Sequence, residues 1–157
     1  MLRPRVIDET ACMVVSSSRL PAPRIIAARG SAVRSLSVGY LTGLSGIAQP
    51  EPGSQDGWRK LEQLCKWLTD CYHWPEWPDL WVFAASDTAH RRQEDEALHR
   101  LAMATGAHDP QKLELALRVV LDGAAVAAAL GDSDRAAKAL PTLLAAAGRQ
   151  AGIPPLP

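Results

Sequence analysis

The chain has 157 residues, of which 47% are hydrophobic and 22% are charged, a composition typical of one soluble globular domain. Basic and acidic residues number 17 each, so no overall charge favours a nucleic acid or a membrane surface. The sequence lacks an apolar run long enough to span a bilayer, a secretory signal and paired cysteine spacing, so we expect a cytoplasmic protein with no membrane contact.

Residues 1–30 are rich in arginine and show neither a helix cap nor a sustained apolar period. Pro21 and Pro23 interrupt any helical pattern there, so we expect a poorly structured segment, with a transit peptide as the alternative. Over residues 31–47, apolar side chains recur at three- and four-residue steps. This spacing predicts an amphipathic helix that its glycines weaken, and a loop follows it.

The clearest helical pattern lies at Gly57–Tyr72, where an apolar stripe faces away from the charged side chains. Residues 73–78 contain two prolines and two tryptophans, which should end that helix and bend the chain. A short apolar piece follows at residues 79–85. The sequence therefore predicts a bend and a short apolar element between two longer helices.

Asp87 is a suitable cap for a further helix that should extend to about Thr105. The first part of that helix, residues 90–96, is densely charged. We therefore expect it to be solvated, and we interpret His90 as part of an exposed helix start.

The last third of the chain predicts two helices joined by a tight turn. Asp109 is the expected cap of the first helix, over residues 110–130, and Gly131 is its expected end. Asp132 or Ser133 is the expected cap of the second helix. Alanines give the pair a smooth surface, so the two helices can approach closely, and so can the same pair from a second copy of the chain.

The chain resembles the carboxy-terminal domain of TetR-type (AcrR-like) bacterial transcriptional regulators in three stretches, which are GWRKLEQLCKWLTD at 57–70, LWVFAASD at 80–87 and LDGAAVAAALGDSDRAAKAL at 121–140. The resemblance implies an all-α antiparallel helical bundle. It covers residues 31–148, which we expect to form the ligand-binding and dimerisation domain, with a frayed tail at 149–157. Nothing in residues 1–56 resembles the family's helix-turn-helix domain.

The resemblance also implies an assembly in which the last two helices pair with their copies in a second subunit. The partner would be an identical chain or a full-length relative, and DNA would be reached only indirectly. The predicted dimer-interface residues are Leu117, Leu121, Ala124, Ala128, Leu140 and Leu144.

Tryptophan is unusually common, with five residues against one phenylalanine, and four of the five lie within residues 67–81. One interpretation is an aromatic wall around a small apolar or aromatic effector. The alternative is a large aromatic core. For the first interpretation, the predicted ligand-binding residues are Trp67, Cys71, Trp81, Phe83 and Met103.

The sequence contains no nucleophile elbow, phosphate loop or metalloprotease motif, so we expect neither an enzyme nor a cofactor. Glu96 and His99 have a spacing used in di-iron bundles, but the motif occurs once, so we expect no metal site. Asp122 is interpreted either as a buried hydrogen-bonding residue or as an exposed partner of Arg118 one helical turn away.

These observations predict the ligand-sensing and dimerisation part of a TetR-like bacterial transcriptional regulator, truncated and without its own DNA-binding head. The alternative is a stand-alone helical module that binds a small molecule or a protein and has no transcriptional role.

Overall fold

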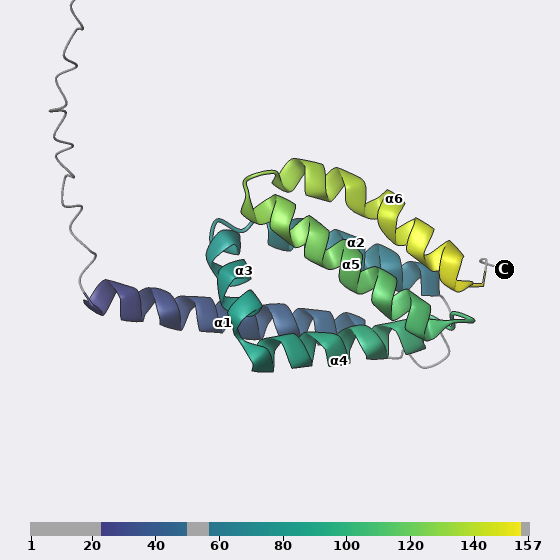
Figure 1. Ribbon diagram of the computed structural model, residues 1–157, viewed down its shortest axis with the longest axis horizontal. Helices are drawn as coiled ribbons and strands as arrows, with labels where there is room; N and C mark the ends of the chain where they lie inside the picture. The colour runs from purple at the N-terminus through teal and green to yellow at the C-terminus, as the bar shows by residue number, and fades with distance from the viewer. Residues whose placement is uncertain (1–22, 50–56, 155–157) are drawn as a thin grey trace, which may run out of the picture.

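A computed structural model describes residues 23–49 and 57–154, with side chains from residue 30 onward. Every regular element in this part of the chain is an α-helix, which confirms the all-α prediction (Figure 1). The helices are α1 (Pro23–Ile47), α2 (Gly57–Tyr72), α3 (Trp77–Ser86), α4 (Thr88–Ala104), α5 (Pro110–Ala129) and α6 (Ser133–Ala151).

The long helices form a bundle in which consecutive helices along the chain mostly run antiparallel, and the short α3 crosses one end of it (Figure 1). α1 and α4 run in the same direction, because Ser37 meets His90, Tyr40 meets Glu94 and Ser45 meets Arg100. α6 packs on α5 and α2, while α5 lies between α6 and α4. α1 packs against α4 and α2, and α3 contacts α1, α4 and α5. No helix in the described ranges combines the length and apolar character needed to cross a membrane.

α1 begins at Pro23 rather than at residue 31, because proline is compatible with the first helical position. Its weak glycine-containing stretch is held by packing. A Cβ added at Gly43 would lie 2.7 Å from the Trp67 ring, so the missing side chain makes room for the indole. The Trp67 ring in turn lies 5.0 Å from that of Tyr40, which fixes α1 on α2.

Aspartate caps begin two helices where the sequence predicts them. The Asp87 side chain accepts hydrogen bonds from the backbone N–H groups of Ala89 and His90, and Asp109 accepts one from Lys112 N–H. After α5, Gly131 has a φ of 92°, a left-handed conformation that suits glycine at the turn into α6.

The described part of the predicted frayed tail is ordered, because α6 continues to Ala151 and the tail was expected to begin at residue 149. The backbone N–H groups of His108 and Asp109 donate to the carbonyls of Gly152 and Ala151, at 3.2 and 3.0 Å. The indole of Trp58 donates to the Pro154 carbonyl at 2.8 Å. Residues 155–157 of the predicted frayed tail lie outside the described part of the chain. Residues 1–22 of the predicted poorly structured amino-terminal segment also lie outside it.

The six predicted dimer-interface residues lie in the core of the single chain. α5 is covered by α6, α4 and α3, and α6 also packs on α2. All six side chains are therefore buried without a second copy; they are Leu117, Leu121, Ala124, Ala128, Leu140 and Leu144. The alanine surface serves the close approach of α5 and α6 within one chain, since small side chains let helix axes come close.

Candidate ligand-binding cleft

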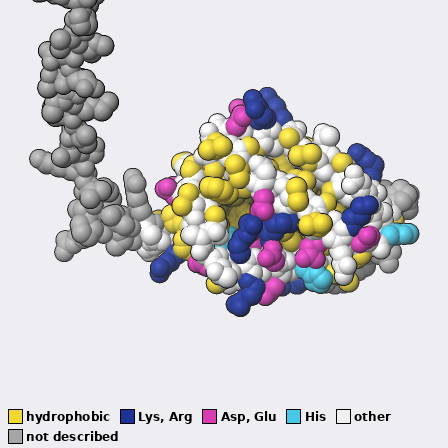
Figure 2. All heavy atoms as spheres, in the orientation of Figure 1, with side chains coloured by type: hydrophobic (Ala, Val, Ile, Leu, Met, Phe, Trp, Pro, Cys, Tyr) yellow, Lys and Arg dark blue, Asp and Glu magenta, His cyan; other side chains and the backbone are white. Residues whose placement is uncertain are grey.

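A small cleft opens between α3, α4 and α5, with Tyr40 of α1 at its base. Figure 2 shows this side of the molecule, where hydrophobic side chains surround a hollow and basic and acidic side chains gather below it. Its volume is about 40 Å³. Its lining residues are Tyr40, Trp77, Leu80, Trp81, Ala84, Ala85, His90, Arg91, Glu94, Leu121, Asp122 and Ala125.

An ion pair joins α4 to α5 beneath the cleft. Glu94 Oε2 accepts a hydrogen bond from Arg118 Nη1 at 2.7 Å, and the two side chains are only 10% and 16% exposed. Glu94 Oε1 accepts a second bond from the Tyr40 hydroxyl at 2.9 Å, which ties α1 to the pair. Both carboxylate oxygens of this nearly buried acid are thus satisfied, as the cost of burying an ionised group requires.

A second ion pair lies at the rim of the cleft. The Arg91 guanidinium donates to both carboxylate oxygens of Asp122, at 3.0 and 3.2 Å, from side chains that are 45% and 43% exposed. Arg118 also contacts Asp95 and reaches Asp122 at 3.7 Å. Asp122 is therefore a half-buried partner of Arg118, which lies between the two interpretations of the sequence, and it also joins α5 to α4.

His90 occupies the inner part of the cleft and is only 4% exposed. Its ring stacks on Tyr40 with centroids 5.8 Å apart, and Phe83 lies edge-on at 6.4 Å. Burial lowers the pKa of His90 below its usual value and so favours the neutral ring. The expectation of a solvated helix start is wrong for His90, and also for Glu94, which is 7% exposed.

The hydrogen bond to Ser37 decides which ring nitrogen of His90 carries the proton. Ser37 is 5% exposed, and its Oγ lies 2.7 Å from His90 Nδ1. The hydroxyl has no other partner in the described part of the chain, and leaving a buried donor unused costs about 1–3 kcal/mol. We therefore assign the Ser37 hydroxyl as the donor to Nδ1, which places the proton on Nε2.

Nε2 of His90 has no hydrogen-bond partner among the described residues. Every side-chain N or O atom of these residues that is sealed from solvent does have a partner. Solvent therefore reaches Nε2, and the cleft is the hollow that the ring lines. The inner end of the cleft thus presents one N–H donor that no described protein group accepts.

Aromatic side chains form the apolar wall of the cleft. Trp77 is 4% exposed, its indole N–H donates to the Ala125 carbonyl at 3.1 Å, and its ring lies 5.8 Å from Tyr40. Trp81, one helical turn further along α3, is half-buried on the lining. Trp77 therefore belongs to the aromatic core of the second interpretation and also lines the cleft, while an aromatic wall around an effector stays a prediction.

The structure does not bring the five predicted ligand-binding residues together, and of the five only Trp81 lines the cleft. Cys71 is fully buried, and burial raises the pKa of its thiol to about 12. Trp67 packs on Tyr40, Phe83 contacts the His90 ring, and Met103 is 57% exposed near the end of α4.

Sequence reasoning missed His90 and Glu94, although a signal for both was present. Counting back from Leu101 and Ala97 in steps of three and four residues reaches Glu94 and then His90, so both continue the buried face of α4. The density of charge in that segment hid the pattern. His99, in contrast, lies on the outer side, where its Nδ1 is 2.8 Å from Glu114 Oε2.

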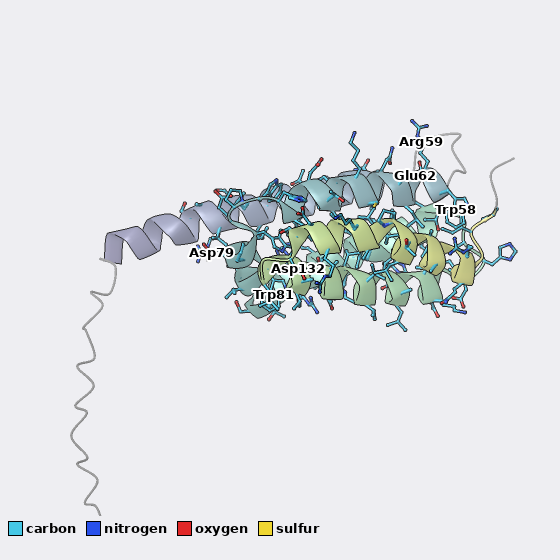
Figure 3. All side chains as sticks on the ribbon, turned by 90° about the horizontal axis from the view of Figure 1, so that it is seen from above. Trp58, Arg59, Glu62, Asp79, Trp81 and Asp132 are labelled. Carbon is cyan, nitrogen blue, oxygen red and sulfur yellow. The ribbon has the colours of Figure 1, made fainter. Side chains whose placement is uncertain are left out.

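A larger hollow of about 400 Å³ lies between α2 and α6. Figure 3 places its Trp58 and Glu62 at the opposite end of the bundle from Trp81. Its inner surface is apolar, with Leu61 and Leu144 beneath it. Because it contains no buried polar group to orient a ligand, we consider the α3–α4–α5 cleft the better candidate site.

Comparisons with protein-family models, curated proteins and solved structures found no match to this chain. The resemblance to TetR-type regulators therefore stays a prediction.

Proposed function

We propose that this chain is a helical small-molecule-binding module and that its ligand occupies the cleft between α3, α4 and α5. The observation that carries the proposal is the unpartnered Nε2 of the buried His90. Solvent reaches this nitrogen at the inner end of the cleft, and ligand sites combine apolar walls with a few placed polar groups. A bound ligand would replace solvent as the acceptor of the Nε2–H group.

The arrangement favours binding over catalysis. Glu94 is occupied by Tyr40 and Arg118, and Asp122 by Arg91, so neither carboxylate is left free to act as a general base. These contacts hold three helices in place around the cleft. They suit recognition of a ligand without chemical change.

A sensor role of the TetR type is the regulatory form of this proposal, and it rests on the sequence resemblance. A ligand that touches both α3 and α4 would favour one spacing of these helices, and a partner that carries a DNA-binding head would transmit that preference. The protein would act in the bacterial cytoplasm and reach DNA only through that partner. The alternative, a stand-alone binding module, uses the same cleft without the transcriptional output.

The experiment is a fragment screen on the ¹⁵N-labelled full chain, followed by mapping of the amide shifts. We expect bound fragments to shift the amides of α3, α4 and α5 that surround the cleft. Ala84→Leu should fill the cleft and abolish the shifts, whereas Val82→Leu, on the exposed side of the same helix, should leave them unchanged. Fragments that bind only between α2 and α6, or not at all, would overturn the proposal.

A second candidate function is assembly with another copy through the outer side of α5. The observation that favours it is a set of exposed apolar side chains, in which Leu115 and Val119 of α5 are 67% and 65% exposed and Leu130, directly after α5, is 81% exposed. Such side chains on a soluble protein mark interaction surfaces when they are contiguous. Unlike the predicted interface residues, these side chains are available to a partner.

Sedimentation velocity at micromolar concentration tests this assembly. We expect a dimer that Val119→Asp dissociates, whereas Val38→Asp, an equally exposed position on α1, should leave it intact. A strict monomer would reject the assembly.

A further inference from the structure

The charge around the cleft restricts what can bind there. Two guanidinium groups, Arg91 and Arg118, face three carboxylates, Glu94, Asp95 and Asp122, while His90 is held neutral by burial. The cluster therefore carries one net negative charge next to a partly enclosed space. An anionic group brought to His90 would be repelled by this excess charge.

The direction of the free hydrogen bond restricts the ligand in a second way. If Ser37 donates to Nδ1, Nε2 carries hydrogen and needs an acceptor. An ammonium group offers only donors, so it would force the proton onto Nδ1 and leave the buried Ser37 hydroxyl without an acceptor. The net negative charge would attract a cation, but the inner end of the cleft cannot pair with it.

The size of the cleft restricts the part of the ligand that can enter. About 40 Å³ corresponds to roughly three water molecules on the scale where one needs about 10–15 Å³. A group of about that many heavy atoms fits next to His90. Anything larger must lie at the mouth, where the half-buried Trp81 offers an apolar surface.

We propose that the cleft selects an uncharged ligand in which a small carbonyl group is attached to an apolar ring. The carbonyl oxygen accepts the hydrogen bond from His90 Nε2–H, and the ring packs against Trp81 at the mouth. The class includes aryl ketones and aryl amides. This inference rests on the proposed ligand-binding function and adds to it the chemistry of the ligand.

The test uses four probes that share a phenyl ring and differ in the attached group. They are acetophenone, benzoate, benzylamine and ethylbenzene, and each is titrated into the ¹⁵N-labelled full chain at about pH 8, where the His90 ring, whose pKa is lowered by burial, is neutral. We expect acetophenone to shift the amides around the cleft. Ethylbenzene, which lacks the acceptor, should bind roughly tenfold more weakly, as expected for one lost hydrogen bond. Benzoate and benzylamine should bind more weakly than acetophenone as well.

Two histidine variants test the role of His90 in this preference. His90→Phe keeps a ring of similar size and should erase the preference for acetophenone over ethylbenzene. His99→Phe changes an exposed histidine on the same helix and should preserve it. Should His90→Phe fail to fold, Ser37→Ala removes the hydroxyl that sets the tautomer, and this variant should reduce the same preference.

The outcomes separate the ligand class from the underlying function. Tighter cleft binding by benzoate, benzylamine or ethylbenzene than by acetophenone would overturn the ligand class and leave the binding function standing. Absence of cleft shifts with all four probes would overturn both.

Discussion

Replacing Arg118 by methionine should destabilise the fold by about 3 kcal/mol, because it removes the main partner of a nearly buried carboxylate. Glu94 and Arg118 are 10% and 16% exposed, and their closest atoms are 2.7 Å apart. Without the guanidinium, Glu94 keeps the Tyr40 hydroxyl but loses its nearest positive charge. Methionine retains most of the apolar volume, so the loss of the charge dominates the effect.

The magnitude follows from the remaining contacts of Glu94. Breaking a buried ion pair by removing one partner costs about 3–5 kcal/mol. Arg91 lies 3.9 Å from Glu94 Oε2 and compensates in part, which places the expected value at the lower end of that range. Glu94→Gln combined with Arg118→Met should recover part of the loss, because no unpaired charge then remains beneath the cleft.

The assay is urea unfolding followed by far-UV circular dichroism, with all four members of the double-mutant cycle compared. Arg92→Ala is the matched control on α4, because its contact with Glu96 spans 3.9 Å between exposed side chains. That variant should change stability by less than about 0.5 kcal/mol. A loss below about 1 kcal/mol for Arg118→Met would refute the argument, because a pair worth so little behaves like a surface contact.

Three further predictions concern burial and close packing. Desolvation by burial raises the pKa of both tyrosines of the chain, so phenolate absorbance should stay absent in the folded protein above pH 10. The stability that the protonated phenols provide should be fully present below about pH 10, the pKa of tyrosine in the unfolded chain, and should be lost as the pH rises above that value. Phenolate absorbance from the native protein near pH 10 would contradict this prediction. Gly57→Ala should lower the free energy of unfolding by several kcal/mol in thermal unfolding, because the added Cβ would lie 2.2 Å from the Thr105 carbonyl oxygen. Gly39→Ala is the control: its Cβ would meet open space, so it should stabilise α1 by about 0.5–1 kcal/mol. Leu117→Ala should lower the free energy of urea unfolding by about 2–5 kcal/mol, because Leu117 is fully buried. Leu115→Ala, on the exposed side of α5, should lower it by less than about 0.5 kcal/mol. Equal effects would mean that Leu117 does not lie in the core.

Local signals in the sequence were sufficient for most of the helices. Asp87 and Asp109 begin α4 and α5 as caps, and Gly131 ends the turn before α6, because each acts through bonds or dihedral angles a few residues away. The start of α1 at Pro23 was missed, since a proline that would break a helix interior is also suited to a first turn.

The cleft was less predictable, because it depends on contacts between residues far apart in the chain. Ser37 contacts His90 and Tyr40 contacts Glu94, and the residues of each pair are more than fifty positions apart in the chain. No local pattern in α1 predicts these contacts. The alanine-rich surface of α5 and α6 allowed two uses in the sequence, close packing within one chain and pairing with a second copy. The structure shows the first use, since Ala124 is buried within its own chain. Pairing with a second copy stays a prediction.

The protonation of the His90 ring is the most direct test of the account, and long-range ¹H–¹⁵N NMR of the histidine side chains measures it. We predict that, at about pH 8, the His90 ring carries its hydrogen on Nε2, and that added acetophenone shifts this signal, with a nuclear Overhauser contact from the ring to the methyl group. If the His90 ring carries hydrogen on Nδ1 instead, or if its signals ignore every probe that binds the protein, the cleft does not recognise its ligand in the way proposed.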